Sequence, residues 1–225
     1  MKIHPYLAGV AVVAVLAGSG VGEPAAPVGV PVQQAAAGAS ADLELVAAST
    51  DVTAAAKVKY VFPVKASNVS WHKTHSGYPA TDIFVACGKP FRATTSGVVL
   101  EVSRVDKYKK GKPAGPNNGG KFVSILGDDG VRYYGSHLSS VASGIKKGVR
   151  VKAGQQVGKT GKTGNASNVC HVHYGISPAC KKTGDWKVRR GVVWPAGYLT
   201  SWRKGGQKSP VKAVAAWKKK NNCKA

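Results

Sequence analysis

The sequence predicts a mostly β protein with an antiparallel β-sandwich or β-roll core. Glycine and proline are abundant, with 28 and 12 residues in a chain of 225, and both interrupt helices. Short stretches that alternate or are rich in β-branched residues follow one another from residue 93 to residue 177. Few helix signals separate them, so successive strands are expected to pair with one another.

The strand-like stretches can be placed in order along the chain. Residues 93–105 alternate and carry β-branched side chains, and residues 106–120 form a long polar loop. Residues 121–138 predict a hairpin, with Gly-Asp-Asp-Gly as its turn. Residues 143–167 are typical of short strands punctuated by glycine, and residues 169–177 predict a further strand.

Composition divides the chain into four segments. Residues 1–20 resemble a signal peptide, with a basic start, a short apolar run and small residues at the expected cut. An uncleaved anchor is the alternative, although the run is shorter than the roughly 20 residues of a membrane span. Residues 21–57 are typical of an Ala/Pro-rich linker or pro-segment. We expect the folded domain at 58–203 and a basic tail, either solvated or a tether, at 204–225.

The charge balance is strongly basic, with 33 Lys and Arg against 10 Asp and Glu and a net charge of +23. Such a surface attracts polyanions, and charge alone does not choose between nucleic acid, an anionic cell wall and an anionic membrane. Both interpretations of the N-terminus place the domain outside the cytoplasm. We therefore expect anionic cell-wall polymers as partners and no nucleic acid.

The four cysteines of this exported chain are expected to form disulfide bonds. Cys170 and Cys180 flank a stretch whose Gly-Ile-Ser-Pro favours a turn, so we favour the pair Cys170–Cys180. That choice leaves Cys87 with Cys223 as a possible second pair. A zinc site with cysteine ligands is less favoured, because no CxxC spacing occurs.

Histidines form the most specific pattern in the predicted β domain. His171 and His173 lie two residues apart on a predicted strand, so their side chains project from the same face, about 7 Å apart. His75 precedes Asp82, whose carboxylate enters an apolar run and needs a partner such as a metal ion or an arginine. His72 is so close that spacing alone does not choose between it and His75.

His137 follows the predicted hairpin and is the last histidine of this pattern. Zinc takes nitrogen and oxygen ligands, and a catalytic zinc site keeps three protein ligands and a water, which two histidines and one aspartate satisfy. No HExxH sequence occurs, so a glutamate base of that type is excluded, and no GxSxG sequence supports a serine nucleophile. A hydrolase with this inventory would need a histidine as its base.

At these residues the chain resembles the lysostaphin-type, or LytM-like, zinc endopeptidases. The family's H-x(n)-D motif, its Tyr/His-Leu-Ser segment and its closing H-x-H read here THSGYPATD, YYGSHLSS and CHVHYGIS. GVRVKAGQQVGKTGKTGNAS and CGKPFRATTSGVV also match, so the resemblance covers roughly residues 60–178 in order. The extension DWKVRRGVVWPAGYLTSWRKG is similar to one in actinobacterial members.

The resemblance implies that His75, Asp82 and His173 are the zinc ligands and that His137 and His171 are the catalytic histidines. It also implies a core of the duplicated hybrid motif type, with long loops around a zinc groove. Two departures stand out. The spacing from histidine to aspartate is longer than the commoner one, and the segment before the H-x-H lacks the frequent Gly-Pro type turn.

The function expected from these features is that of a secreted, monomeric zinc endopeptidase that hydrolyses amide bonds in peptidoglycan peptides. A non-catalytic cell-wall-binding or hydrolase-activator module is the alternative, and the complete ligand set argues against it. A basic nucleic-acid binder is disfavoured by the export signal and by the lack of a nucleic-acid motif.

Overall fold

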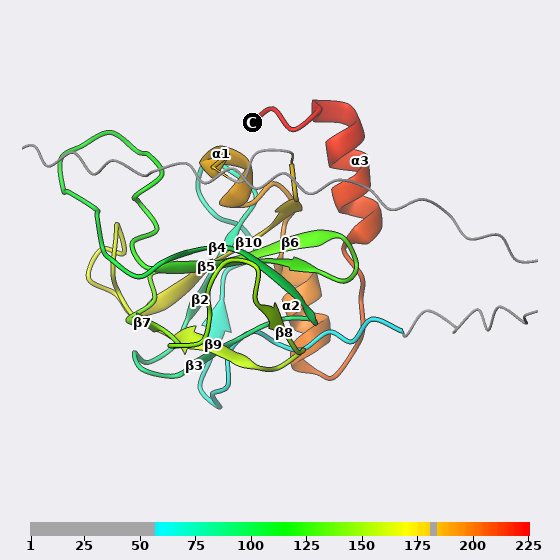
Figure 1. Cartoon of the computed structure of the whole chain (residues 1–225), viewed down its shortest axis with the longest axis horizontal. Helices are drawn as coiled ribbons and strands as arrows, with labels where there is room; N and C mark the ends of the chain where they lie inside the picture. Colours follow the sequence, from blue (N-terminus) through cyan, green and yellow to red (C-terminus); the bar gives the residue numbers. More distant parts are fainter. Residues whose placement is uncertain (1–56, 181–183) are drawn as a thin grey trace, which may run out of the picture. The chain divides into compact units, whose positions relative to one another are not determined.

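The computed structural model describes residues 57–180 and 184–225, which build two antiparallel β-sheets (Figure 1). The larger sheet has seven strands in the order β1-β2-β10-β6-β5-β4-β8, and the smaller has three in the order β3-β9-β7. Every strand pairing in these residues is antiparallel, which confirms the predicted mostly β fold class. The strands are β1 (Ser70–Trp71), β2 (Thr81–Phe84), β3 (Pro90–Arg92), β4 (Gly97–Ser103), β5 (Phe122–Gly127), β6 (Val131–Ser136), β7 (Ser140–Val141), β8 (Arg150–Val151), β9 (Gln156–Lys159) and β10 (His171–Pro178).

Strands form where the sequence predicts them, with shorter bounds in most cases. The region 93–105 contains β4, and the region 121–138 contains β5 and β6. The hairpin turn is closed by the Gly130 N–H, which donates to the Gly127 carbonyl oxygen at 2.9 Å. The last predicted strand, 169–177, is β10, and it lies between β2 and β6 in the sheet.

Three helices follow β10, and one of them lies in the segment that composition assigned to a basic tail. Helix α2 packs inward through Leu199 and Trp202, and the Trp202 ring stacks on Tyr60 with 5.6 Å between centroids. Helix α3 buries Val214 against the core. Among the described helices, none has the length and apolar character that a membrane crossing requires. The helices are α1 (Trp186–Arg189), α2 (Ala196–Arg203) and α3 (Val211–Asn221).

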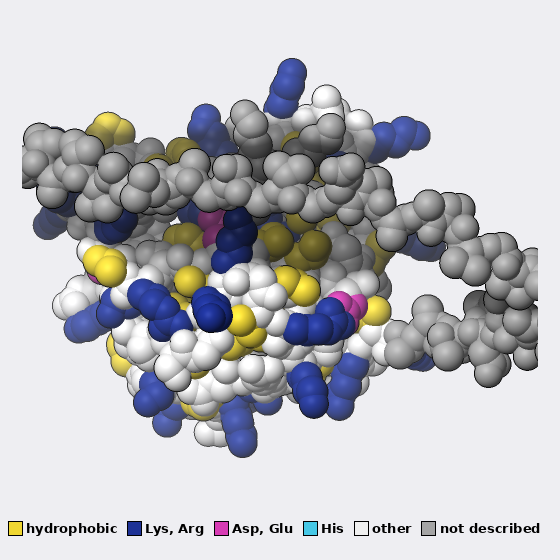
Figure 2. Space-filling model, viewed as in Figure 1, with side chains coloured by type: hydrophobic (Ala, Val, Ile, Leu, Met, Phe, Trp, Pro, Cys, Tyr) yellow, Lys and Arg dark blue, Asp and Glu magenta, His cyan; other side chains and the backbone are white. Residues whose placement is uncertain are grey.

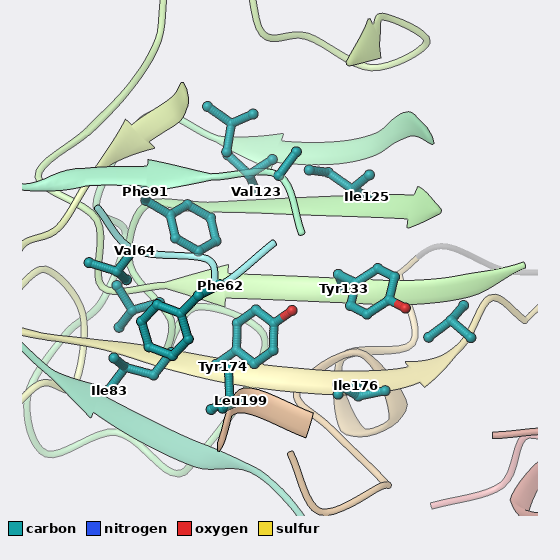
Figure 3. Packing of buried hydrophobic residues seen from close by; sticks show 14 of the residues in the cluster. Phe62, Val64, Ile83, Phe91, Val123, Ile125, Tyr133, Tyr174, Ile176 and Leu199 are labelled. Atoms are coloured by element: carbon teal, nitrogen blue, oxygen red, sulfur yellow. The ribbon is translucent and has the colours of Figure 1, made fainter. Parts of the chain in front are cut away.

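The core lies between the two sheets and continues beneath α2 (Figure 3). Phe91 of β3 reaches the large sheet at Gly135 of β6, where an added Cβ would collide with the Phe91 ring. Glycine at this position therefore permits the close approach of the two sheets. The other labelled core side chains come from the larger sheet, from α2 and from the chain before β1: Phe62, Val64, Ile83, Val123, Ile125, Tyr133, Tyr174, Ile176 and Leu199.

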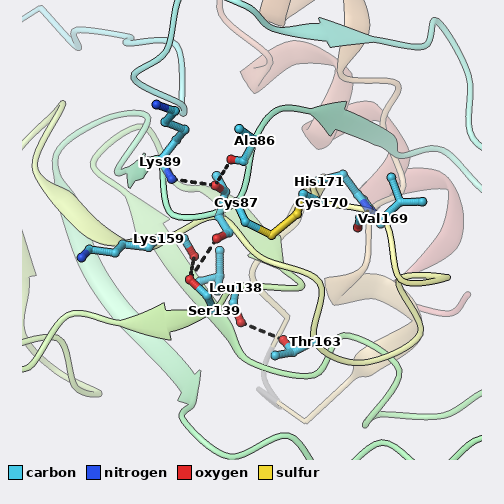
Figure 4. The surroundings of a disulfide bond; sticks show 11 residues. Ala86, Cys87, Lys89, Leu138, Ser139, Lys159, Thr163, Val169, Cys170 and His171 are labelled. Carbon is cyan, nitrogen blue, oxygen red and sulfur yellow. Dashed lines mark hydrogen bonds between the residues drawn. A yellow bond between two sulfur atoms is a disulfide. The ribbon is translucent and has the colours of Figure 1, made fainter.

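All four cysteines form disulfide bonds, but the favoured pairing is wrong. The structure joins Cys87 to Cys170 (Figure 4) and Cys180 to Cys223. Gly-Ile-Ser-Pro does not turn; it continues β10, whose eight residues separate Cys170 from Cys180. At about 3.3 Å per residue, these two cysteines lie far beyond the reach of a disulfide bond.

Removing the Cys87–Cys170 bond is expected to lower the free energy of unfolding by about 2–5 kcal/mol, because it closes a long loop of the unfolded chain. The double variant Cys87→Ala/Cys170→Ala should also bind divalent metal more weakly, since this bond ties the chain after β2, which carries Asp82, to the start of β10, which carries His173. Urea unfolding and metal titration measure the two effects. Cys180→Ala/Cys223→Ala is the matched control, expected to lose stability but keep its metal affinity; equal losses of affinity would contradict this assignment.

Candidate active site

The central strand β10 brings the predicted site residues together. His173 pairs in register with Asp82 of β2 on one side and with Ser136 of β6 on the other. His75 lies in the loop before β2, and His137 directly follows β6. Three separate stretches of chain thus meet at one end of adjacent antiparallel strands. Together with loop residues 114–119 and the chain around α1, they line a single groove.

Three side chains offer ligand atoms at one point of this groove. One nitrogen each of His75 and His173 and one carboxylate oxygen of Asp82 lie within 4.8 Å of one another. Nδ1 of His173 is 3.1 Å from Oδ1 of Asp82, and Nε2 of His75 is 3.9 Å from Oδ2. Atoms bound tetrahedrally at about 2 Å from one zinc ion would lie about 3.3 Å apart, so this donor set suits zinc in chemistry and spacing.

Hydrogen bonds assign the tautomer of each candidate ligand histidine. Nδ1 of His75 lies 2.8 Å from the Ser76 carbonyl oxygen, which only accepts, so Nδ1 carries the hydrogen and Nε2 is free. Nε2 of His173 donates in the same way to the Arg190 carbonyl oxygen at 2.9 Å. Its Nδ1 lone pair therefore faces the Asp82 carboxylate, a contact that is favourable only with a proton or a metal cation between the two atoms.

His137 and His171 form a second pair beside the candidate ligands. Their ring centroids are 4.6 Å apart, and both side chains are buried. His137 donates from Nδ1 to the Thr163 carbonyl oxygen at 2.7 Å, and His171 donates from Nδ1 to the Val169 carbonyl oxygen at 2.9 Å. In both rings Nε2 is left as the basic nitrogen. The pair can thus accept and return protons next to a metal site.

Burial and neighbouring charges shift the pKa values of this cluster. Burial lowers the pKa of His137 to about 3, and the charges of His173 and His171 act in the same direction. Burial also lowers the pKa of His75, so both rings are neutral at neutral pH. For Asp82, burial acts to raise the pKa, but the hydrogen bond to His173 and the facing histidines outweigh it, so the pKa is lowered. His75 and Asp82 therefore offer a neutral imidazole and an ionised carboxylate, the forms that bind metal.

The structure distinguishes His75 from His72, which spacing alone did not. The His72 ring is exposed and lies on Phe84, with centroids 5.0 Å apart. His75 faces Asp82 and packs edge-on against His173, with centroids 4.9 Å apart. Of the two histidines, only His75 belongs to the cluster that the described residues form.

Several groove residues were not predicted from the sequence. Tyr78 lies inside the motif that carries two candidate ligands, and its ring is 4.4 Å from that of His75. Trp186, Arg189 and Arg190 come from the chain that follows β10 and line the same groove. The sequence does show two consecutive arginines shortly after a tryptophan, but nothing in their spacing indicates that these residues return to the histidines. Tyr134 of β6 completes the wall.

Comparison with known proteins identifies relatives of this domain. Residues 74–184 match the model of peptidase family M23, a span that includes all five predicted site residues. The glycyl-glycine endopeptidase ALE-1 of Staphylococcus capitis is 36% identical over 96 residues, which are 41% of this chain and 22% of that protein. This chain thus spans about a fifth of the length of the curated relative that it matches.

Solved structures with a similar fold include two peptidases. The catalytic domain of the antimicrobial peptidase lysostaphin from Staphylococcus simulans is 24% identical, with a TM-score of 0.46 and coverage of 60% of this chain and 94% of that chain. A zinc-containing peptidase from Vibrio cholerae is 21% identical, with a TM-score of 0.41 and coverage of 52% and 36%. The segment 74–184 of this chain is thus a peptidase family M23 domain, as the lysostaphin-type motifs predicted.

Proposed function

We propose that the chain is a secreted, zinc-dependent endopeptidase that hydrolyses amide bonds in peptidoglycan peptides. The observation that carries this proposal is the convergence of three ligand atoms within 4.8 Å, beside two histidines whose Nε2 atoms are free. Membership of peptidase family M23 supports peptide-bond hydrolysis. The relative that is named a glycyl-glycine endopeptidase supports a cell-wall peptide as the substrate class.

His75, Asp82 and His173 would hold the metal through Nε2, a carboxylate oxygen and Nδ1, respectively. When bound, zinc supplies a Lewis acid that polarises a carbonyl group and lowers the pKa of water towards about 7. The protein holds these three groups in place through the Ser76 and Arg190 carbonyl oxygens, which fix both imidazole orientations.

His137 is proposed to act as the general base. Its neutral ring accepts a proton at Nε2 from the attacking water, while Nδ1 stays bound to the Thr163 carbonyl oxygen. Because its pKa is low, the protonated ring readily passes that proton to the leaving amine. If the free Nε2 of His171 takes up a proton, that nitrogen would donate a hydrogen bond to the oxyanion that develops on the carbonyl group.

The two disulfide bonds and the basic surface support the proposed location and partners. Disulfide bonds persist in oxidising compartments, which fits an exported protein. Lys and Arg side chains spread over the face shown in Figure 2, where Asp and Glu are few. A net charge of +23 would concentrate the protein on anionic wall polymers, and high salt should weaken that attraction.

The proposed function is tested with purified peptidoglycan of defined cross-bridge. The zinc-loaded protein should lower the turbidity of the suspension and release fragments whose masses identify one cleaved amide bond. EDTA should stop the reaction, and added zinc should restore it. Full activity after complete removal of metal would contradict the zinc assignment, and release of no fragment would favour a non-catalytic wall-binding module.

A further inference from the structure

Arg190 is the groove residue whose charge the structure leaves without a partner. Its neighbour Arg189 pairs with Glu101 at 2.9 Å and donates to the Pro116 carbonyl oxygen. Arg190 forms no ion pair within the described residues, and its buried Nε has no hydrogen-bond partner there. Because an uncompensated buried charge is costly, a guanidinium in a groove with free donors indicates an anionic ligand.

Aromatic rings hold the Arg190 guanidinium in position. Its Cζ lies 3.7 Å from the centroid of the Tyr78 ring and 5.0 Å from that of Trp186. Such stacking fixes the plane of a guanidinium while its N–H groups still point outward along the edges. The chain that carries Trp186 is itself anchored, because Asp185 pairs with the fully buried Arg132 at 2.6 Å. The donors of Arg190 are thus preorganised.

The same residue lies next to the proposed reaction centre. The main-chain carbonyl oxygen of Arg190 accepts the hydrogen bond from His173. The Tyr78 ring contacts both groups, because its centroid lies 3.7 Å from Cζ of Arg190 and 4.4 Å from the His75 centroid. An extended peptide covers these two distances together in two or three residues, at about 3.3 Å each.

We propose that Arg190 binds a carboxylate of the substrate, two or three residues from the scissile amide bond. A planar guanidinium can donate two parallel hydrogen bonds to a carboxylate, which gives both affinity and orientation. The peptidase would therefore select acidic peptides over their neutral amides. This inference rests on the proposed function, because the carboxylate and the scissile bond would share one groove.

Two matched pairs of peptides test the inference on the full, zinc-loaded chain. Each pair presents the cleaved bond with a nearby carboxylate or with the corresponding carboxamide; in one pair the group is a side chain, and in the other it is the C-terminus. Wild type should show a kcat/KM about 10–100 times higher for the acid than for the amide in at least one pair, which identifies the source of the carboxylate. Equal values in both pairs would overturn the proposal.

Variants separate recognition from general damage. Arg190→Gln should lose the preference for the acid, and Arg190→Lys should keep part of it as a point charge. Lys187→Gln is the matched control, because it removes an exposed charge from the same helix outside the groove and should leave the preference unchanged. If Arg190→Gln lowers kcat/KM equally for acid and amide, Arg190 is a positioning residue and the proposal is wrong.

Calorimetric binding to the metal-free protein distinguishes this proposal from the proposed function. Wild type should bind the acidic peptide about tenfold or more tightly than the amide, and Arg190→Gln should bind both with the same affinity. A protein that binds acids selectively through Arg190 but cleaves neither peptide would support the carboxylate subsite while contradicting the peptidase activity. Cleavage of both peptides without any selectivity would support the peptidase activity and contradict the carboxylate subsite.

Discussion

Replacing Asp82 by alanine is expected to weaken zinc binding by at least about a hundredfold and to reduce hydrolysis to background. Asp82 supplies the one carboxylate of the candidate metal centre, and its oxygens face nitrogens of His75, His171 and His173. Its loss leaves two imidazoles, whereas loss of an outer-shell partner alone costs about 10–100-fold in metal affinity. Competition with a chromogenic chelator measures the affinity, and release of wall fragments measures the activity.

His72→Ala is the matched control for Asp82→Ala. Its exposed ring lies only three residues before His75, on Phe84 and outside the cluster of ligand atoms. The variant should bind zinc and cleave walls like wild type, and near-ultraviolet circular dichroism should show that both variants are folded. Unchanged zinc affinity in Asp82→Ala, or equal losses in the two variants, would contradict the assignment of the metal centre.

Local patterns predicted the strands and singled out candidate ligands, whereas the family resemblance implied that these residues converge on one site. The H-x-H pair needed only the alternation of side chains along β10. Asp82 was predicted to need a partner, because a carboxylate that enters an apolar run is costly when it is unpaired. In the structure it pairs in register with His173. The choice between His72 and His75 required the path of the loop before β2, which no local rule supplies.

Features that depend on distant parts of the chain could not be predicted in this way. The disulfide pairing failed because Gly-Ile-Ser-Pro was interpreted as a turn, while its partners across the sheet keep it in β10. Arg190 reaches the groove because Asp185 binds Arg132 on β6 and the carbonyl oxygen of Arg190 meets His173. Both contacts join residues that only the sheet brings together.

Replacing His137 by asparagine is expected to lower kcat/KM by about 10²–10⁴-fold while zinc affinity stays within a few-fold of wild type. His137 has a φ of +64°, a backbone conformation that asparagine tolerates better than most residues, so the change removes the base with little strain. Its ring contacts the candidate ligands without belonging to the cluster of ligand atoms. A loss of zinc affinity as large as that in Asp82→Ala would contradict a purely catalytic role of His137.

The same variant should change how stability depends on pH. Burial lowers the pKa of His137 to about 3 from an ordinary value of 6.5, so the unfolded chain takes up this proton before the folded one does. The contribution of this difference to the free energy of unfolding is complete above pH 6.5. It is lost as the pH falls towards 3, at about 1.4 kcal/mol per pH unit. His137→Asn cannot take up the proton, so its free energy of unfolding should fall less steeply in this window. Urea unfolding at several pH values, from neutral to acidic, measures this dependence. If the free energy of unfolding falls equally steeply in the variant and in wild type, uptake of this proton is not coupled to folding.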